Sequence, residues 1–196
     1  MVDCKTVLDI GCGPDSPIQY CEHLDNTLGV EPFQPYLEQS KQKKIHTDYI
    51  NKSIDELDFE ENSFDAVIML EVIEHLKEQE GLNVLKKLEK WAKKKVVVST
   101  PNGFFPQKMV DNNPMQVHLS GWDVEKMESL GFLKIFGLAG LKHLRAEIDH
   151  DSMDAELFIS MKYKPKFFWF MIATLSQMLT YHFPSMAFGL FCVKMK

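Results

Sequence analysis

The residues best placed to do chemistry stand in a glycine turn close to the N-terminus. Residues 7–14 read VLDIGCGP, a short apolar run that ends in two glycines, Gly11 and Gly13. Glycines directly after a buried strand let the backbone turn sharply and approach a bound ligand where any side chain would clash. Cys12 lies between them and is best interpreted as a small residue rather than a nucleophile.

A carboxylate follows at the spacing of a nucleoside site. Glu31 comes 20 residues after Gly11, at the end of a second predicted strand, and precedes Pro32 and Phe33. A carboxylate at this point can accept hydrogen bonds from both ribose hydroxyls, each contributing about 1.5–3 kcal/mol when desolvated. The turn and the acid together predict a nucleoside-binding crevice at the carboxyl ends of neighbouring strands.

The glycine pattern distinguishes two classes of nucleoside cofactor. The dinucleotide fingerprint G-x-G-x-x-G needs a third glycine where this chain has Ser16. Asp9, two residues before the first glycine, would repel a pyrophosphate but suits a cationic amino-acid ligand. The pattern therefore favours S-adenosylmethionine over a nicotinamide cofactor. A tight turn with a buried, hydrogen-bonded Asp9 is the structural alternative.

Strands and helices alternate along the chain, which predicts an α/β protein with a mostly parallel sheet. The clearest helix covers residues 80–94, with Leu85, Leu88 and Trp91 on one side and lysines opposite. The strand-like runs are residues 5–10, 27–30, 64–70, 95–100, 132–138 and 187–194. Later helices are expected at 122–130 and 166–181, after a long loop at 101–121. The polar stretch 143–154 is not assigned.

The order of these segments resembles the class I S-adenosylmethionine-dependent methyltransferases. The segments VLDIGCGPDSP, GVEPF, SFDAVIMLEVIEHL and KKVVVSTPNG resemble successive motifs of that family between residues 5 and 103. Two later segments, HLSGWDVEKMESLGF and FPSMAFGLFCVKMK, are similar to its type 11 subgroup. The resemblance implies a Rossmann-like, doubly wound sheet of seven strands in the order 3-2-1-4-5-7-6. Strand 7 would be antiparallel, and helices would lie on both faces.

The resemblance also implies one methyltransferase domain over residues 1–196. Residues 1–100 would be the cofactor-binding half, and residues 101–196 would carry the substrate loop, the later helices and strands 6 and 7. The family usually has a helix or two before the first strand, closing over the cofactor, whereas this chain begins almost at that strand.

The cofactor contacts implied by the resemblance follow the motifs. The methionine moiety would face the glycine turn, the ribose would meet Glu31, and the adenine would lie beside Pro32 and Phe33. Ser53 replaces the acid that the family often has near the adenine amine, and Asp48 or Asp55 could substitute for it. The implied set is Asp9, Gly11, Cys12, Gly13, Glu31, Pro32, Phe33, Ser53, Ile54, Leu70 and Glu71.

Two histidines are candidates for a catalytic base, which methyl transfer needs only if the acceptor must lose a proton. His75 follows the strand at 64–70, and His118 lies near the end of the long loop. A structural role, packing at a helix start or ordering the loop, is the alternative for each. Glu71, Glu74 and Glu78 would share a helical face with His75. No matching ligand cluster stands elsewhere, so the sequence predicts no metal site.

Composition narrows the partners and the location. The net charge is −6, and no basic stripe with interleaved aromatic residues appears, which argues against nucleic acid. The expected acceptor is therefore a small molecule, or a lipid or glycan intermediate, in a pocket lined by Phe104, Phe105 and Met109. Four cysteines without a C-x-x-C pair fit a reducing cytoplasm. A noncatalytic methyltransferase-like binding module and a nicotinamide-dependent oxidoreductase remain as alternatives.

The C-terminal stretch from Phe167 to Val193 is strongly apolar. Its longest helix-like piece, residues 167–180, is shorter than the roughly 20 residues that a membrane span needs. The sequence therefore predicts no transmembrane span, but a buried helix followed by a strand. Peripheral membrane contact, a hydrophobic acceptor and a homodimer contact through residues 167–178 stay open.

Overall fold

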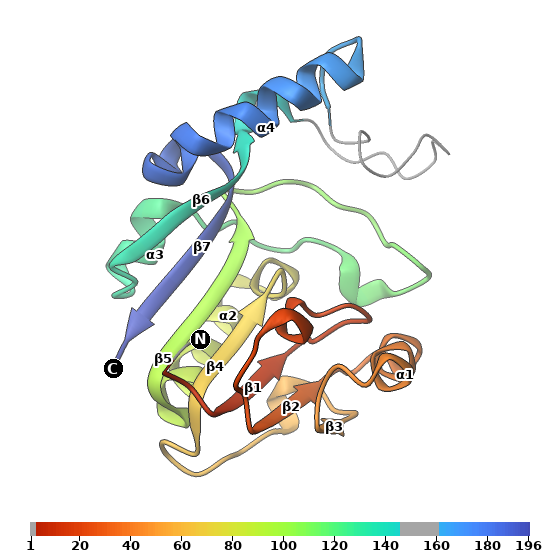
Figure 1. Ribbon diagram of the computed structural model, residues 1–196, viewed down its shortest axis with the longest axis vertical. Coiled ribbons are helices and arrows are strands. Elements are labelled where there is room, and N and C mark those ends of the chain that lie inside the picture. Colours follow the sequence, from red (N-terminus) through yellow and green to blue (C-terminus); the bar gives the residue numbers. More distant parts are fainter. Residues whose placement is uncertain (1–2, 146–160) are drawn as a thin grey trace. The chain divides into compact units, whose positions relative to one another are not determined.

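A seven-stranded sheet is the centre of the computed structural model, which describes residues 3–145 and 161–196 (Figure 1). The strand order is β3-β2-β1-β4-β5-β7-β6. The strands are β1 Thr6–Ile10, β2 Asn26–Val30, β3 Asp48–Ile50, β4 Phe64–Leu70, β5 Ala92–Pro101, β6 Lys134–Leu141 and β7 Ala187–Met195.

The predicted fold class and strand order are confirmed. β1 pairs in parallel with β2 and β4, so Asp9 lies between Gly29 on one neighbour and Ile68 on the other. The arrows in Figure 1 show β7 running opposite to β5 and β6, as expected for an antiparallel strand 7. β3 has only three residues, and the residue pattern alone did not reveal it.

Four α-helices accompany the sheet in the described residues: α1 Gln34–Lys43, α2 Glu78–Trp91, α3 Val124–Ser129 and α4 Lys166–His182. α2 ends at Trp91 rather than at the predicted Lys94, because the chain continues as β5 from Ala92. α3 begins at Val124 rather than at Trp122, since the Asp123 side chain caps it by accepting from the Lys126 amide at 2.9 Å. Most of the unassigned stretch 143–154 lies outside the described residues.

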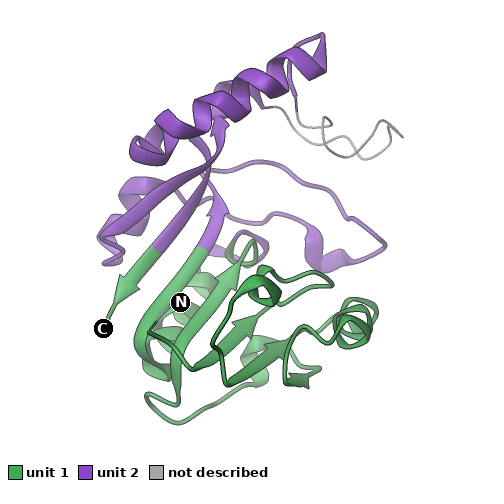
Figure 2. Cartoon of the chain, in the orientation of Figure 1, with its two compact units in different colours: residues 1–73, 79–98, 193–196 green, residues 74–78, 99–192 purple. Residues whose placement is uncertain are grey.

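The chain forms two compact units (Figure 2). Unit 1 comprises residues 1–73, 79–98 and 193–196, and unit 2 comprises residues 74–78 and 99–192. The expected single domain with halves 1–100 and 101–196 stays a prediction. In unit 1 the apolar strands β1 and β4 and the inner side of α2 form the core, and Leu8, Leu88 and Trp91 are fully buried. In unit 2 the largest buried side chains are Trp122, Phe132 and Met127.

The prediction of a buried C-terminal helix was wrong. α4 forms as expected, but only Ala173 and Thr180 of its residues are buried. Leu175 is 68% exposed and Met178 is 81% exposed. The side of the helix that packs inward includes Ala173 and the polar residues Ser176 and Gln177, which bond to the backbone of β6. Among the described residues, no helix combines the length and the apolar character that crossing a membrane requires.

Candidate active site

The glycine turn after β1 has the backbone that its sequence predicts. Gly11 and Gly13 have φ angles of +67° and +56°, a region that L-residues rarely adopt. A Cβ on Gly11 would come within 2.4 Å of Val72 Cγ2, whereas a Cβ on Gly13 would meet nothing within 4 Å. The turn therefore packs closely at Gly11 and leaves open space over Gly13.

Glu31 closes β2 with a carboxylate that the backbone holds in place. Its Oε2 accepts from the Gly13 amide at 3.0 Å, and its Oε1 accepts from the Phe33 amide at 2.9 Å. Asn51 fixes the backbone at the same point by donating to the Glu31 carbonyl at 2.8 Å. Burial raises the pKa of Glu31, and the two amide hydrogen bonds oppose that shift. Because a carboxylate offers about four acceptor positions, two remain for ribose hydroxyls.

Asp9 is buried, and one of its carboxylate oxygens makes two contacts within unit 1. Its Oδ2 accepts from the Ser16 hydroxyl at 2.5 Å and lies 2.9 Å from His46 Nε2. The His46 ring packs against Gly29, where a Cβ would meet it at 2.9 Å. This geometry supports the structural alternative for Asp9, and its contact with a methionine moiety stays a prediction. Sequence reasoning missed His46, which lies 37 residues from Asp9 with no spacing signal.

The adenine-side residues lie next to Glu31 or further along unit 1. Phe33 is half-buried and contacts the Tyr36 ring at 4.9 Å between centroids. Ile54 is buried and starts a short turn, in which the Ser53 amide donates to Glu56 Oε2 at 2.9 Å. Asp48 and Asp55, the candidate substitutes for the missing acid, are both exposed.

Two further predictions in unit 1 concern the end of β4 and the turn cysteine. Leu70 ends β4, and Glu71 follows it with a φ of +54°. A non-glycine residue in this region stores backbone strain, which is concentrated at functional sites. Cys12 is buried, and burial raises the pKa of its thiol, so it stays protonated and unreactive.

Unit 2 brings His75 and His118 together. The carbonyl of Glu74 accepts from the Leu119 and Ser120 amides at 2.7 and 3.1 Å, which ties the end of the long loop to the turn after β4. The two imidazole rings consequently lie 4.8 Å apart between centroids. Their 43 residues of sequence separation gave no indication of this proximity.

Hydrogen bonds fix the orientation of both rings. His75 Nδ1 faces the Val117 carbonyl at 3.2 Å, and His118 Nδ1 faces the Phe105 carbonyl at 2.6 Å. Since a carbonyl only accepts, each Nδ1 carries the proton and each neutral ring keeps a lone pair on Nε2. Burial lowers the pKa of His75 to about 4 and also lowers the pKa of His118, so both rings are neutral near pH 7.

The buried carboxylate of Glu74 completes this group. One ligand atom from each of Glu74, His75 and His118 lies within 4.8 Å of the others. His118 thus adds a third side chain able to coordinate a cation beside Glu74 and His75. The sequence did not indicate that it lies there. The expectation of no metal site stays a prediction.

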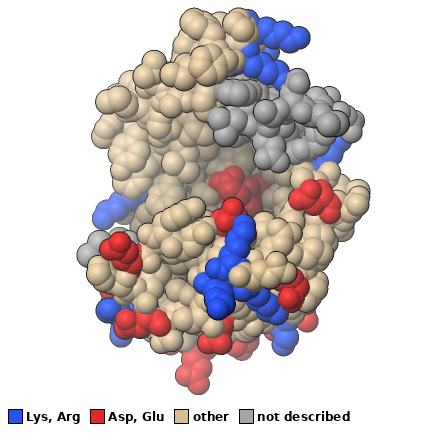
Figure 3. All heavy atoms as spheres, turned by 45° about the vertical axis from the view of Figure 1, so that its right-hand side comes forward, with Lys and Arg blue, Asp and Glu red and all other residues tan. Residues whose placement is uncertain are grey.

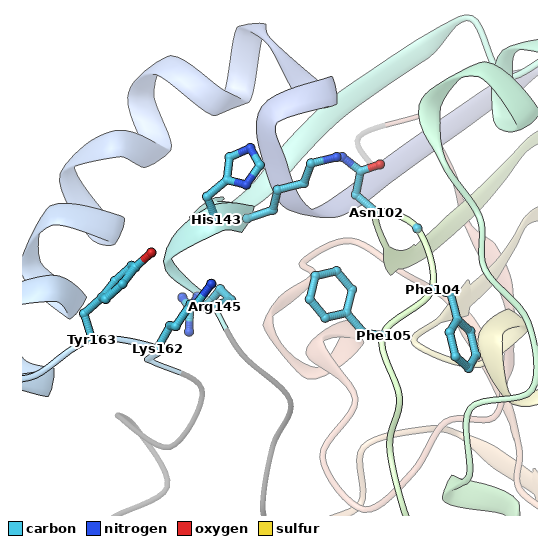
Figure 4. A pocket seen from close by; sticks show the side chains of 9 residues that line it. Asn102, Phe104, Phe105, His143, Arg145, Lys162 and Tyr163 are labelled. Atoms are coloured by element: carbon cyan, nitrogen blue, oxygen red, sulfur yellow. The ribbon is translucent and has the colours of Figure 1, made fainter.

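A cavity of about 400 Å³ opens in unit 2 (Figure 4). Phe104 and Phe105 are among its lining residues, whereas Met109 is not and is half exposed. That these residues line the acceptor pocket stays a prediction. The other lining residues are Asn102, Gly103, Lys142, His143, Arg145, Lys162 and Tyr163. These described lining residues include four basic side chains and no carboxylate. The sequence did not show this cluster, because its members come from three separate segments.

The cavity is joined to the histidine pair through one residue. The ring of Phe105 lines the cavity and contacts the Phe188 ring at 4.7 Å, while its carbonyl accepts from His118. The guanidinium of Arg145 lies over the Phe188 ring, with its Cζ 5.4 Å from the ring centroid. Burial lowers the pKa of its guanidinium, which remains a cation at any ordinary pH.

Comparison with known proteins finds a family profile and several solved structures that resemble this chain. A family profile described as "Methyltransferase domain" matches residues 8–99, which include the glycine turn, Glu31 and β4. Residues 8–99 therefore carry the sequence pattern of a methyltransferase domain. No curated protein sequence matches the chain significantly.

Solved methyltransferases share the fold over the whole described chain. A methyltransferase from Archaeoglobus fulgidus matches 99% of this chain and 87% of its own length, at 16% identity and a TM-score of 0.59. The plantazolicin methyltransferase BpumL, crystallised with S-adenosylhomocysteine, matches 98% of this chain and 76% of its own, at 12% identity and a TM-score of 0.56.

The methyltransferase domain of bacterial CtHen1 matches 100% of this chain and 92% of its own length, at 18% identity and a TM-score of 0.55. For PH0226 from Pyrococcus horikoshii OT3, the match spans only 51% of that protein, at a TM-score of 0.47 and 23% identity. These likenesses establish the fold of the methyltransferase domain, but not an acceptor.

Proposed function

We propose that the chain transfers a methyl group from S-adenosylmethionine to a small-molecule or lipid- or glycan-type acceptor. The observation that carries the proposal is the Glu31 carboxylate, which the amides of Gly13 and Phe33 hold at the end of β2. A fixed acid beside an open, positive-φ glycine suits a nucleoside whose other end is a cationic amino acid. Structural relatives crystallised with S-adenosylmethionine or its product support this cofactor.

The residues of unit 1 fit this cofactor. Glu31 would accept from the ribose hydroxyls, and the half-buried Phe33 ring would face the adenine. The open space over Gly13 would admit the methionine portion close to the backbone. Leu70 and Glu71, at the end of β4, would also contact the cofactor. The other cofactor contacts that the resemblance implies remain part of the proposal. The bound sulfonium supplies an activated methyl carbon, so the protein need only align the acceptor and exclude water.

The lining of the cavity in unit 2 suits an acceptor that has a flat or apolar part and also an anionic group. Phe104 and Phe105 offer rings, and Lys142, Arg145 and Lys162 offer positive charge without any carboxylate in the described lining.

His118 is the proposed base when the acceptor is a hydroxyl or an amine. Its Nε2 lone pair would take the acceptor proton as the acceptor heteroatom bonds to the methyl carbon and the carbon–sulfur bond breaks. S-adenosylhomocysteine would then leave as a neutral thioether. His75, with a pKa near 4, is the weaker base and would chiefly position its neighbour.

Glu74, His75 and His118 also suit a second candidate role, the binding of a divalent cation. Two neutral imidazoles and a buried carboxylate whose ligand atoms lie within 4.8 Å of one another also suit a divalent cation. We expect methyl transfer to persist in EDTA. A loss that Mn²⁺ or Zn²⁺ restores in the original protein, but not in His118→Asn, would replace the base by a cation-binding role.

Calorimetric titration with S-adenosylmethionine, S-adenosylhomocysteine and NAD⁺ tests the proposal. We expect micromolar binding of the first two ligands and no heat from NAD⁺. Selective NAD⁺ binding would support the oxidoreductase alternative. A folded protein that binds none of the three would support the noncatalytic module. A cytoplasmic location remains our expectation and fits the four free cysteines.

A further inference from the structure

Helix α4 presents a continuous apolar face away from the protein. The residues of this outer face are Phe167, Phe168, Met171, Leu175, Met178 and Leu179, each at least 43% exposed. They recur at intervals of three or four positions and so form one stripe along the helix. A contiguous apolar stripe of this kind marks an interaction site.

Two polar residues of α4 face inward and bond to β6. Gln177 accepts from the Gly140 amide at 3.0 Å and donates to the Gly137 carbonyl at 2.8 Å. Ser176 accepts from the Leu141 amide at 3.0 Å. Ala173 is buried against Leu144 and Met161, and Trp169, Phe170 and Ile172 pack against the same cluster. The helix therefore carries apolar residues on its outer side in addition to those that it packs inward, whereas a surface helix usually turns polar residues to water.

Small residues of β6 hold this helix close to the strand. A Cβ on Gly137 would meet the Thr180 carbonyl oxygen at 2.1 Å, and one on Gly140 would meet the Ala173 carbonyl oxygen at 2.0 Å. Such close backbone approach fixes which side of α4 points outward. The exposed apolar side is therefore a consequence of specific packing and not of a helix free to turn over.

Positive charge accompanies the outer face. Residues 161–196 contain five lysines and no aspartate or glutamate, although the whole chain carries a net charge of −6. Three of the five, Lys162, Lys164 and Lys166, stand at the start of α4 beside Phe167 and Phe168. Figure 3 shows an uncharged surface at the top of the molecule, where Figure 1 places α4, with lysine and arginine atoms at one end.

We propose that α4 docks the protein on the surface of an anionic lipid bilayer. The outer face would lie in the boundary between headgroups and acyl chains, with Lys164 and Lys166 on the headgroups. The 17-residue helix is about 25 Å long and lies along such a surface rather than across it. This inference does not depend on the proposed function, because docking needs neither cofactor nor acceptor.

The charge pattern favours a membrane over a second copy of the chain. A symmetric dimer through this face would bring the same surface from both subunits together. With no carboxylate in residues 161–196, neither copy would offer that surface an opposite charge from this segment. Anionic headgroups supply that charge, and acyl chains take up the apolar stripe.

Sedimentation of the full chain with vesicles tests the proposal. We expect binding to vesicles of phosphatidylcholine with phosphatidylglycerol and much weaker binding to phosphatidylcholine alone. Leu175→Ser combined with Met178→Ser should lower the partition coefficient at least about tenfold, by removing apolar area. Lys164→Gln and Lys166→Gln together should lower it by a similar factor on the anionic vesicles.

Matched variants separate α4 from general surface effects. Leu133 is 85% exposed and lies outside the outer face, so Leu133→Ser should bind as the original protein does. Replacing Lys41 and Lys43 by glutamine removes the same charge from α1 and should also leave binding unchanged. Circular dichroism and melting temperature would show that each variant is folded.

Two outcomes would overturn the proposal. Absence of sedimentation with anionic vesicles, by a folded chain that is monomeric in gel filtration, would show that the face binds no lipid. A dimer that Leu175→Ser with Met178→Ser converts to monomer, without vesicle binding by either form, would assign the face to a second copy instead.

Discussion

At the residue scale, Glu31 organises the candidate cofactor site. Its two carboxylate oxygens hold the glycine turn and the backbone after β2 in one arrangement, through Gly13 and Phe33. An acid that is already positioned by backbone amides need not be reoriented when ribose hydroxyls arrive. Preorganisation of this kind lowers the entropic cost of binding.

Replacing Glu31 by glutamine should weaken cofactor binding. The amide has one acceptor oxygen, and its NH₂ group would face a backbone N–H that now donates to the carboxylate. We expect the Kd for S-adenosylmethionine to rise about 10- to 100-fold, the equivalent of one or two charge-assisted hydrogen bonds. Calorimetry would measure it, with Glu38→Gln on α1 as the control. An unchanged Kd for Glu31→Gln would remove Glu31 from the site.

Removing His46 should destabilise the fold through Asp9. His46→Ala leaves the buried side chain of Asp9 with only the Ser16 hydroxyl, and removing one partner of a buried hydrogen bond costs about 1–3 kcal/mol. Urea unfolding would measure the loss. Asp25→Ala breaks the exposed pair with Lys5 and should cost less than about 1 kcal/mol. If both variants lost the same free energy of unfolding, the buried contact between Asp9 and His46 would contribute no more than the exposed ion pair.

At the element scale, close backbone packing decides how α4 lies on β6. Gly137→Ala should destabilise unit 2, because its Cβ would meet the Thr180 carbonyl at 2.1 Å and Ala187 Cβ at 2.5 Å. Backbone cannot move aside cheaply, so we expect a loss of about 2–4 kcal/mol. The nearest atom to a Cβ on Gly189 lies at 3.4 Å, so Gly189→Ala in β7 is the matched control. Thermal unfolding would compare them, and similar melting temperatures would contradict the packing argument.

The sequence predicted the elements whose pattern is local. The buried runs of β1 and β4, the period of α2 and the glycine turn follow from residues within a few positions of one another, and the resemblance supplied the strand order. β3 has three residues, too few for a pattern, and the end of α2 depends on pairing by distant strands.

The candidate site was predictable only where it is contiguous in sequence. Glu31 and its glycines follow motif spacing, whereas His46, the histidine pair and the basic cavity arise when segments far apart in the chain meet. The burial of α4 was wrongly predicted because apolar composition cannot say which side packs. The inward hydrogen bonds of Ser176 and Gln177 decide that, and they depend on glycines in β6.

At the scale of the whole molecule, buried neutral histidines make stability depend on pH. Burial lowers the pKa of His75 from 6.5 to about 4. The unfolded chain therefore takes up a proton at His75 more readily than the folded chain between these values. The contribution of His75 to folding stability is fully present above about pH 6.5 and is lost as the pH falls toward 4.

This linkage predicts a smaller acid sensitivity in a variant without the imidazole. Between about pH 7.5 and pH 5 the original chain should lose about 1–2 kcal/mol through His75, allowing for the partial exposure of the ring. His75→Asn keeps a donor for the Val117 carbonyl but does not titrate, so its melting temperature should fall less over the same interval. Replacing the exposed His23 by asparagine should leave the fall in melting temperature over this interval as it is in the original chain. If His75→Asn loses as much stability as the original, other groups account for the pH dependence, and the ring of His75 is not held neutral by burial.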